Sequence, residues 1–303
     1  MSFDRARVLV FTMMTLSSVA VLAQETSYVQ TQDLVYAQPH GIGLLMDVFV
    51  PKGDKNGLAI IDIMSGAWHS DRGKIKDHTR SQTFQIFCQK GYTVFAIRPG
   101  SITKFGALEM RDNMNVGIRW VKDHAKEYGI DPDRLGLTGA SAGGHLASLT
   151  ALTAHDETTA DGKKATTGDT RVKAVAVFFP PTDFLTYGKT PESPNGSERL
   201  RQIARRLAYP DRMTEPSTDE LIQLLTKISP AQLVTEKAPP FLLVHGDADP
   251  VVPLQQSEVL MDALKKAGIP VELVVKKGGG HAWLTIHEEV QTIGDWFDKH
   301  LKD

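Results

Sequence analysis

The chain has 303 residues, of which 41% are hydrophobic, and its 34 basic and 36 acidic residues give a formal net charge of −2. This length allows one large α/β domain or two small ones. A near-neutral chain has no electrostatic footprint for nucleic acid or for an anionic membrane, so we expect neither as a partner. Cys88 is the single cysteine, which excludes an internal disulfide, and its expected role is burial as a small hydrophobic side chain.

The N-terminus has the composition of a secretory signal. Arg5 and Arg7 precede an apolar run from Val8 to Ala23, which ends in small residues before the polar sequence QETS. This pattern predicts a cleaved signal peptide over residues 1–23. The run is short for a membrane span, which takes roughly 20 apolar residues. We therefore expect a secreted or periplasmic protein with no membrane partner after cleavage, the alternative being a buried helix or an uncleaved anchor.

Short apolar runs then alternate with longer amphipathic stretches. Several of the short runs are continuously aliphatic, as strands buried on both faces of a parallel sheet require, while the first two alternate and favour an antiparallel edge hairpin. The expected strands cover residues 33–37, 44–50, 58–64, 92–98, 134–139, 172–179, 241–246 and 271–277. Helices are expected at about 77–90, 108–128, 142–153, 254–267 and 285–302, with Gly91, Gly129 and Gly268 marking helix ends.

This alternation predicts an α/β fold: one doubly wound, mostly parallel, eight-stranded sheet in a single domain over residues 24–303. The interval of about 181–237 interrupts the rhythm because it is rich in Pro, Gly and Ser. It contains two helix-like stretches, 197–208 and 218–227, the second of which starts with a capping-box sequence. We predict that this interval is a small helical cap inserted over the carboxyl edge of the sheet.

The sequence GASAG at residues 139–143 has the pattern G-x-S-x-G between an expected strand and an expected helix. In that setting Ser141 sits on a sharp turn that exposes its Oγ, and the two flanking glycines let the backbones pass closely. The amide of Ala142, at the start of the helix, then faces a developing oxyanion. The pattern predicts a nucleophilic serine, and the alternative is a Gly/Ser-rich turn without chemistry.

A nucleophilic serine needs a base, and the base needs an acid that orients it. Asp249 follows the seventh expected strand and His281 follows the eighth, so both lie at carboxyl ends of strands, where open α/β sheets bind ligands. Asp247 is closer to the strand and suits a turn cap. Asp183 follows the sixth strand and is the rival acid. We predict Ser141, Asp249 and His281 as the catalytic residues.

The loop after the third expected strand should supply further oxyanion donors. The backbone amides of Gly66 and Ala67 lie directly after that strand and could join the amide of Ala142. Trp68 follows them and either walls the substrate pocket or packs in the core. His145 is expected to pack or bond locally. No residue pattern has the spacing of a metal site, and we expect neither a metal nor a cofactor.

Three segments together resemble the α/β-hydrolase family of secreted bacterial esterases and lipases, close to its hormone-sensitive-lipase-like and feruloyl- or acetyl-esterase-like groups. They are GIDPDRLGLTGASAGGHLA at 129–147, APPFLLVHGDADPVVP at 238–253 and GGGHAW at 278–283. The resemblance implies a carboxylic ester hydrolase that works through a Ser-Asp-His triad and an acyl-enzyme. It further implies that the substrate partner is a small acyl ester or an acylated carbohydrate.

One segment departs from the pattern of this family. Relatives show His-Gly-Gly-Gly-Trp after the third strand, whereas this chain has Met-Ser-Gly-Ala-Trp at residues 64–68. A serine at position 65 restricts a loop that glycine leaves free. Two other functions stay open at this point: a serine peptidase of the prolyl-oligopeptidase type, and a non-catalytic binding protein on a hydrolase fold. A cofactor-dependent enzyme is disfavoured because G-x-S-x-G is not the glycine pattern of dinucleotide binding.

Overall fold

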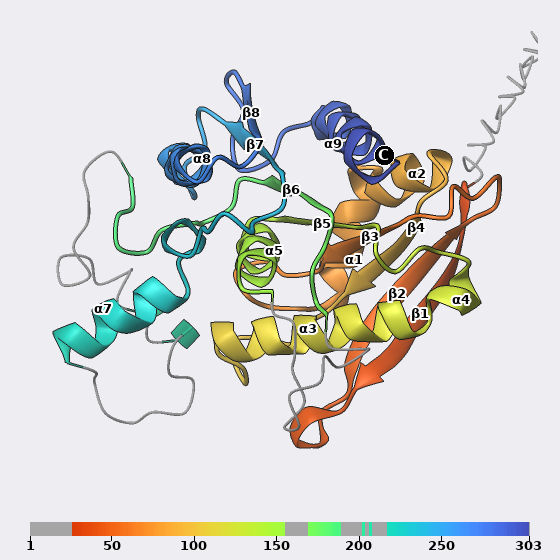
Figure 1. Cartoon of the computed structure of the whole chain (residues 1–303), viewed down its shortest axis with the longest axis horizontal. Helices are drawn as coiled ribbons and strands as arrows, with labels where there is room; N and C mark the ends of the chain where they lie inside the picture. Colours follow the sequence, from red (N-terminus) through yellow and green to blue (C-terminus); the bar gives the residue numbers. More distant parts are fainter. Residues whose placement is uncertain (1–25, 155–168, 189–201, 204–205, 208–216, 303) are drawn as a thin grey trace, which may run out of the picture.

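A computed structural model describes residues 26–154, 169–188, 202–203, 206–207 and 217–302 (Figure 1). The predicted signal peptide at 1–23 lies outside the described residues, as does most of the helix predicted at 197–208. Within the described ranges, no helix combines the length and the apolar character needed to cross a membrane.

Eight strands form one sheet in the order β1-β2-β4-β3-β5-β6-β7-β8 (Figure 1). β2 pairs antiparallel with both β1 and β4, and the strands from β4 to β8 pair in parallel. The doubly wound, mostly parallel, eight-stranded sheet predicted from the sequence is therefore confirmed. The strands are β1 (Tyr28–Ala37), β2 (Leu44–Pro51), β3 (Ala59–Ile63), β4 (Thr93–Ile97), β5 (Leu135–Ala140), β6 (Ala174–Phe178), β7 (Phe241–Gly246) and β8 (Val271–Lys276).

Helices cover both faces of this sheet. Those described are α1 (Arg72–Arg80), α2 (Thr83–Gln89), α3 (Ala107–Asp123), α4 (Ala125–Tyr128), α5 (Ala142–Leu152), α7 (Thr218–Lys227), α8 (Gln255–Lys266) and α9 (Ile286–Leu301), with short 3₁₀ helices η1 (Pro39–Gly41) and η2 (Pro230–Gln232). α3, α5 and α8 share one buried cluster with one face of the sheet. α1, α2 and α9 share a second cluster with the opposite face. Central strands such as β3 are consequently buried along their whole length, which explains their continuous aliphatic sequences.

Two helices and one strand differ from the sequence prediction. The helix expected at 77–90 is divided into α1 and α2, because Gln82 adopts a left-handed conformation with φ of 60°. The stretch expected as one helix at 108–128 is divided into α3 and α4 at His124. β1 begins at Tyr28, five residues before its expected start, because its polar first half pairs with β2 without an alternating apolar pattern.

The described part of the 181–237 interval contains α7. Its capping box is present: the Ser217 hydroxyl accepts a hydrogen bond from the Glu220 amide at 3.3 Å, and the Glu220 carboxylate accepts one from the Ser217 amide at 2.9 Å. Leu221 and Leu225 on α7 are buried in the same cluster as α3 and α5. About half of the rest of the predicted cap lies outside the described residues.

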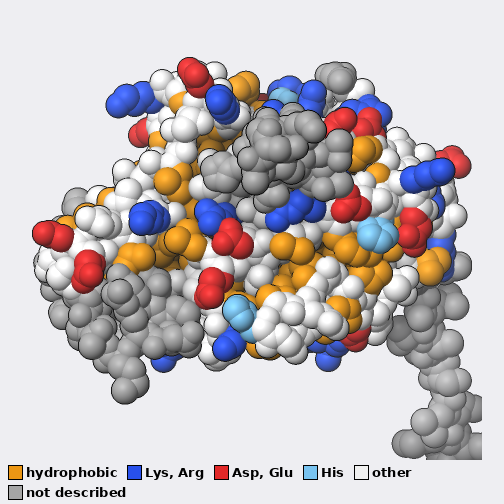
Figure 2. All heavy atoms as spheres, turned by 60° about the horizontal axis from the view of Figure 1, so that its bottom comes forward, with side chains coloured by type: hydrophobic (Ala, Val, Ile, Leu, Met, Phe, Trp, Pro, Cys, Tyr) orange, Lys and Arg blue, Asp and Glu red, His pale blue; other side chains and the backbone are white. Residues whose placement is uncertain are grey.

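The carboxyl ends of β3, β5, β7 and β8 meet along one edge of the sheet. The segments that follow these strands carry the residues singled out in the sequence: 64–69 after β3, Ser141 after β5, 247–249 after β7 and His281 after β8. Elsewhere on the molecule, acidic and basic side chains are interspersed over the described surface in the view of Figure 2, in keeping with the near-neutral charge.

Candidate active site

Ser141 lies on the sharp turn between β5 and α5. Its φ is 55°, a positive value that is costly for a residue with a Cβ and that the surrounding structure must enforce. Its amide donates to the carbonyl of Phe178 at 3.0 Å, which fixes the turn to β6. A Cβ on Gly139 would lie 2.6 Å from the carbonyl carbon of Gly143, so the close passage of the two backbones requires glycine, as the G-x-S-x-G pattern predicts.

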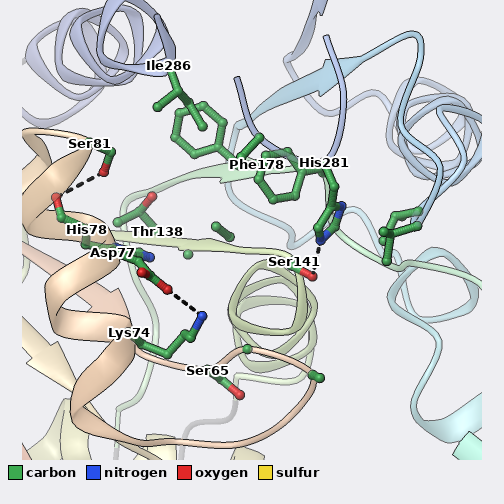
Figure 3. A pocket seen from close by; sticks show the side chains of 18 of the residues that line it. Ser65, Lys74, Asp77, His78, Ser81, Thr138, Ser141, Phe178, His281 and Ile286 are labelled. Carbon is green, nitrogen blue, oxygen red and sulfur yellow. Dashed lines mark hydrogen bonds and ion pairs between the residues drawn. The ribbon is translucent and has the colours of Figure 1, made fainter. Parts of the chain in front are cut away.

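The structure brings the three predicted catalytic residues into one row of hydrogen bonds, and Figure 3 shows the contact between Ser141 and His281. The Ser141 Oγ lies 2.9 Å from Nε2 of His281, and Nδ1 of His281 lies 2.7 Å from Oδ2 of Asp249. Because the Asp249 carboxylate accepts the proton on Nδ1, Nε2 of the neutral ring is left to accept the serine hydroxyl. The imidazole packs against the ring of Phe179, with centroids 4.6 Å apart.

Asp249 is held in its ionised form by its surroundings. Burial alone would raise the pKa of this carboxyl, but the imidazoles of His245 and His281 and the amides of Val252 and Val251 outweigh that effect and hold the pKa well below its ordinary value. Oδ1 accepts the two amides at 2.9 and 2.7 Å. The carboxylate is therefore charged at neutral pH and can stabilise a protonated His281.

His245 supports this acid loop, a role that the sequence did not reveal. The imidazole is fully buried at the end of β7. Nε2 donates to the carbonyl of Val252 at 2.8 Å, and Nδ1 lies 2.7 Å from Oγ of Ser257 on α8. Nε2 also lies 3.6 Å from Oδ2 of Asp249. The loop that carries the acid is thus fixed from the sheet and from α8 together.

The two rival acids make other contacts. Asp247 accepts the amide of Gly278 at 2.6 Å, which is the turn-capping role predicted for it. Asp183 is buried and accepts the amide of Leu185 at 2.9 Å and the hydroxyl of Thr186 at 2.8 Å. Neither carboxylate is bonded to His281 within the described structure.

The loop after β3 differs from the prediction at Gly66. The Gly66 amide donates to the carbonyl of His69 at 2.9 Å, and the His69 amide donates back at 2.8 Å. The Gly66 amide is therefore occupied, which does not fit its predicted role as an oxyanion donor. In the described parts of the chain, the amides of Ala67 and Ala142 have no acceptor. Ala67 has a φ of 46°, a positive value that is uncommon for a residue with a Cβ.

Trp68 lines the cavity and is buried. Its Nε1–H donates to Nδ1 of His145 at 2.9 Å, and Nε2 of His145 donates to the carbonyl of Ile228 at 2.8 Å. Burial lowers the pKa of His145 to about 4, so the ring is neutral and both bonds are satisfied. This chain of bonds ties the loop after β3 to α5, which carries the serine turn.

A cavity of about 940 Å³ opens at Ser141 and His281. One part of its wall is apolar and comes from Phe178, Phe179, Trp283 and Ile286. The remaining wall carries polar and charged side chains, many of them from α1. In the described ranges, no three His, Cys, Asp or Glu side chains converge in a way that could hold a metal ion. Such a cavity can hold a neutral or polar organic substrate against the serine.

The family model BD-FAE matches residues 46–264, which is most of the chain. The protein belongs to the BD-FAE family. Esterase LipQ of Mycobacterium tuberculosis is 34% identical over 246 residues, 79% of this chain and 53% of that protein. The probable carboxylic ester hydrolase LipM of the same organism is 37% identical over 153 residues, 49% of this chain and 32% of that protein. This BD-FAE chain thus spans about a third to a half of the length of these relatives.

Solved structures confirm the fold of this BD-FAE protein. A truncated form of a carbohydrate esterase from gut microbiota superposes with a TM-score of 0.75 at 24% identity, over 92% of this chain and 99% of that one. At this identity the likeness concerns the fold alone. Together with the family match and the named esterases among the relatives, it confirms the resemblance to α/β-hydrolase esterases predicted from the three sequence segments.

Proposed function

We propose that this protein is a serine-dependent carboxylic ester hydrolase. The observation that carries the proposal is the row of hydrogen bonds from the Ser141 hydroxyl through His281 to Asp249, at 2.9 and 2.7 Å. These distances suit proton transfer from a nucleophile to a base that is oriented by an acid. The esterases among the relatives support the same reaction class.

In this mechanism His281 Nε2 takes the proton of the Ser141 hydroxyl while Oγ attacks the ester carbonyl carbon. Asp249 keeps the Nδ1–H tautomer and stabilises the imidazolium that forms. The tetrahedral intermediate collapses and His281 gives its proton to the departing alkoxide. The alcohol is released, and the acyl group remains bound to Ser141. Water then repeats the sequence: His281 removes its proton, the hydroxide adds to the acyl carbon, and the carboxylic acid leaves as Ser141 recovers its proton.

The oxyanion of each tetrahedral intermediate would be bound by the amides of Ala142 and Ala67. Ala142 is the first residue of α5, so the helix dipole adds to its amide. Ala67 belongs to the loop that Trp68 ties to His145. Both amides lack an acceptor among the described residues, which leaves them available for substrate oxygen. Preorganised donors of this kind are typically worth roughly 10²–10³ in rate each.

The substrates proposed are small acyl esters or acylated carbohydrates. A mixed apolar and polar wall around a cavity of about 940 Å³ accommodates either, and the structural neighbour described as a carbohydrate esterase is consistent with the second class.

We also propose a single domain over residues 24–303 with a cap at about 181–237, because α7 shares the buried cluster of the sheet. We further propose that the signal at 1–23 is cleaved and that the protein is exported. The mass of the exported protein tests this, and we expect the mass of a chain that starts at Gln24.

Turnover of matched esters and amides tests the proposed reaction. The 4-nitrophenyl esters of acetate, butyrate and octanoate, with methyl ferulate, are compared with a peptidyl 4-nitroanilide. We expect ester hydrolysis that falls by roughly 10⁴–10⁶ in kcat in Ser141→Ala. Faster hydrolysis of the anilide than of any ester would favour a peptidase. Absence of turnover by the folded protein on every substrate would favour a non-catalytic binding protein.

A further inference from the structure

The cavity extends beyond the serine to a polar end on the face of the sheet covered by α1 and α2. Asp62 on β3 and Thr138 on β5 are paired in register there, and both line the cavity with His78 of α1. Figure 3 shows His78 on the opposite side of the view from Ser141. Thr138 precedes Ser141 by three residues along β5, which places this end roughly 10 Å from the serine along the strand.

Asp62 and His78 form a second acid–imidazole pair at this end. Asp62 is fully buried, and its Oδ2 lies 2.7 Å from Nδ1 of His78. The carboxylate therefore orients the ring and leaves Nε2 as its other polar atom. The His78 side chain retains 16% exposure, and among the described residues Nε2 has no partner. Nε2 is thus available to a ligand in the cavity.

The surroundings of this pair carry an excess of positive charge. Asp77 is shared by two cations, Lys74 at 2.6 Å and Arg80 at 3.2 Å, and all three side chains line the cavity. The stem of Lys74 lies against the loop after β3, where a Cβ on Gly66 would come within 2.8 Å of its Cδ and Cε. With Asp62 counted as well, two carboxylates face Lys74, Arg80 and the imidazole, so this end carries a net positive charge and attracts an anion when His78 is protonated.

Protonation of His78 is favoured by the same arrangement. Burial alone would lower the pKa of the imidazole, and the nearby charge of Lys74 lowers it further. The charge of Asp62 and the hydrogen bond to it, together with the charge of Asp77, outweigh these effects, so the pKa of His78 is raised. Among the described residues, the Oδ1 atom of Asp62 is buried without a partner, and such orphan polar atoms are uncommon in folded proteins.

We propose that His78 determines substrate specificity: its imidazolium form donates the Nε2–H to a carboxylate oxygen carried by the ester substrate at a point remote from the scissile bond. This inference rests on the proposed ester hydrolysis at Ser141. The preferred substrates are then monoesters with a free carboxylate, and Lys74 adds electrostatic attraction. Charge-assisted hydrogen bonds of this kind correspond to roughly 10- to 100-fold in kcat/KM.

The test compares ester pairs of equal length that differ only in the remote group. Mono-4-nitrophenyl esters of adipic, pimelic and suberic acid are each compared with the methyl-capped diester, and 6-acetoxyhexanoate is compared with its methyl ester to place the carboxylate on the alcohol side. In the wild type we expect at least one carboxylate member to exceed its capped partner by about 10-fold or more in kcat/KM. Capped members that react equally fast or faster in every pair would overturn the inference without recourse to any variant.

His78→Asn separates recognition from folding, because the asparagine amide can replace Nδ1 as the donor to Asp62 and has no atom at Nε2. In this variant the ratio of kcat/KM for the carboxylate ester to kcat/KM for its capped partner should fall toward one. A general loss of activity lowers both values alike and cancels in the ratio. His124→Asn is the matched control, since Nδ1 of His124 donates to the Trp120 carbonyl at 2.8 Å outside the cavity. An unchanged ratio in His78→Asn would contradict the proposal. Failure of ester hydrolysis itself would appear separately, as absent turnover of 4-nitrophenyl acetate by the wild type.

Discussion

Replacing His145 by glutamine should remove a pH-dependent part of the free energy of unfolding. His145 is fully buried on α5, where Nδ1 accepts from Trp68 and Nε2 donates to the carbonyl of Ile228. A proton on Nδ1 would face the indole N–H and break the link between the loop after β3 and the serine turn. Glutamine offers an acceptor and a donor on one side chain but does not titrate.

The size of the effect follows from the pKa of the ring. Burial lowers the pKa of His145 from 6.5 to about 4, so between these values the unfolded chain binds a proton that the folded protein does not. Stability from this group is complete above pH 6.5 and is lost as the pH falls toward 4. The full difference corresponds to about 3 kcal/mol, of which about 2 kcal/mol is lost between pH 7 and pH 5.

Urea denaturation at pH 7 and pH 5 measures this contribution. The wild type should lose about 2 kcal/mol more stability between these pH values than His145→Gln does, because other groups titrate alike in both proteins. The variant is expected to be less stable at pH 7 and to approach the wild type at pH 5. Equal pH dependence in the two proteins would refute the assignment of a neutral, doubly bonded imidazole.

Two further changes test the acid and the serine turn. Asp249→Asn should lower kcat for ester hydrolysis by roughly 10³–10⁴, because the amide favours the wrong imidazole tautomer. Asp247→Asn should leave kcat within about 2-fold, because Asp247 caps a turn. Similar losses of kcat in both variants would contradict the choice of Asp249 as the acid. Gly139→Ala should lower the free energy of unfolding by about 1–3 kcal/mol, because its Cβ would lie 2.6 Å from the backbone carbon of Gly143. Gly43→Ala, whose Cβ would meet no atom within 4 Å, is the control, and a Gly139 variant as stable as this control would show that the turn is not tightly packed.

Much of the fold could be predicted because the central strands are buried on both faces. A strand such as β3 is apolar at almost every position, and a continuous aliphatic run between amphipathic stretches has few other structural solutions. The position of Ser141 could also be predicted, since G-x-S-x-G between a strand and a helix combines local geometry with chemistry. Asp249 and His281 could be placed at the same edge because parallel strands end there together.

Features that depend on tertiary contacts gave no such signal. The pairing of Gly66 with His69 is a local bridge inside a loop, and no residue type at either position demands it. Gln82 takes a left-handed conformation between α1 and α2, where the absence of glycine or proline favours a continuous helix. The contact of His78 with Asp62 joins a helix to a strand residue sixteen positions earlier, so packing of α1 on the sheet decides it.

Covalent labelling with a fluorophosphonate tests the central claim most directly, because it requires a hydroxyl that is activated in the folded protein. Intact mass followed by peptide mapping should find one adduct per chain, located on Ser141, and no adduct in Ser141→Ala or in protein unfolded before labelling. A folded protein that takes up no label, or that carries it on a different residue, would contradict the account.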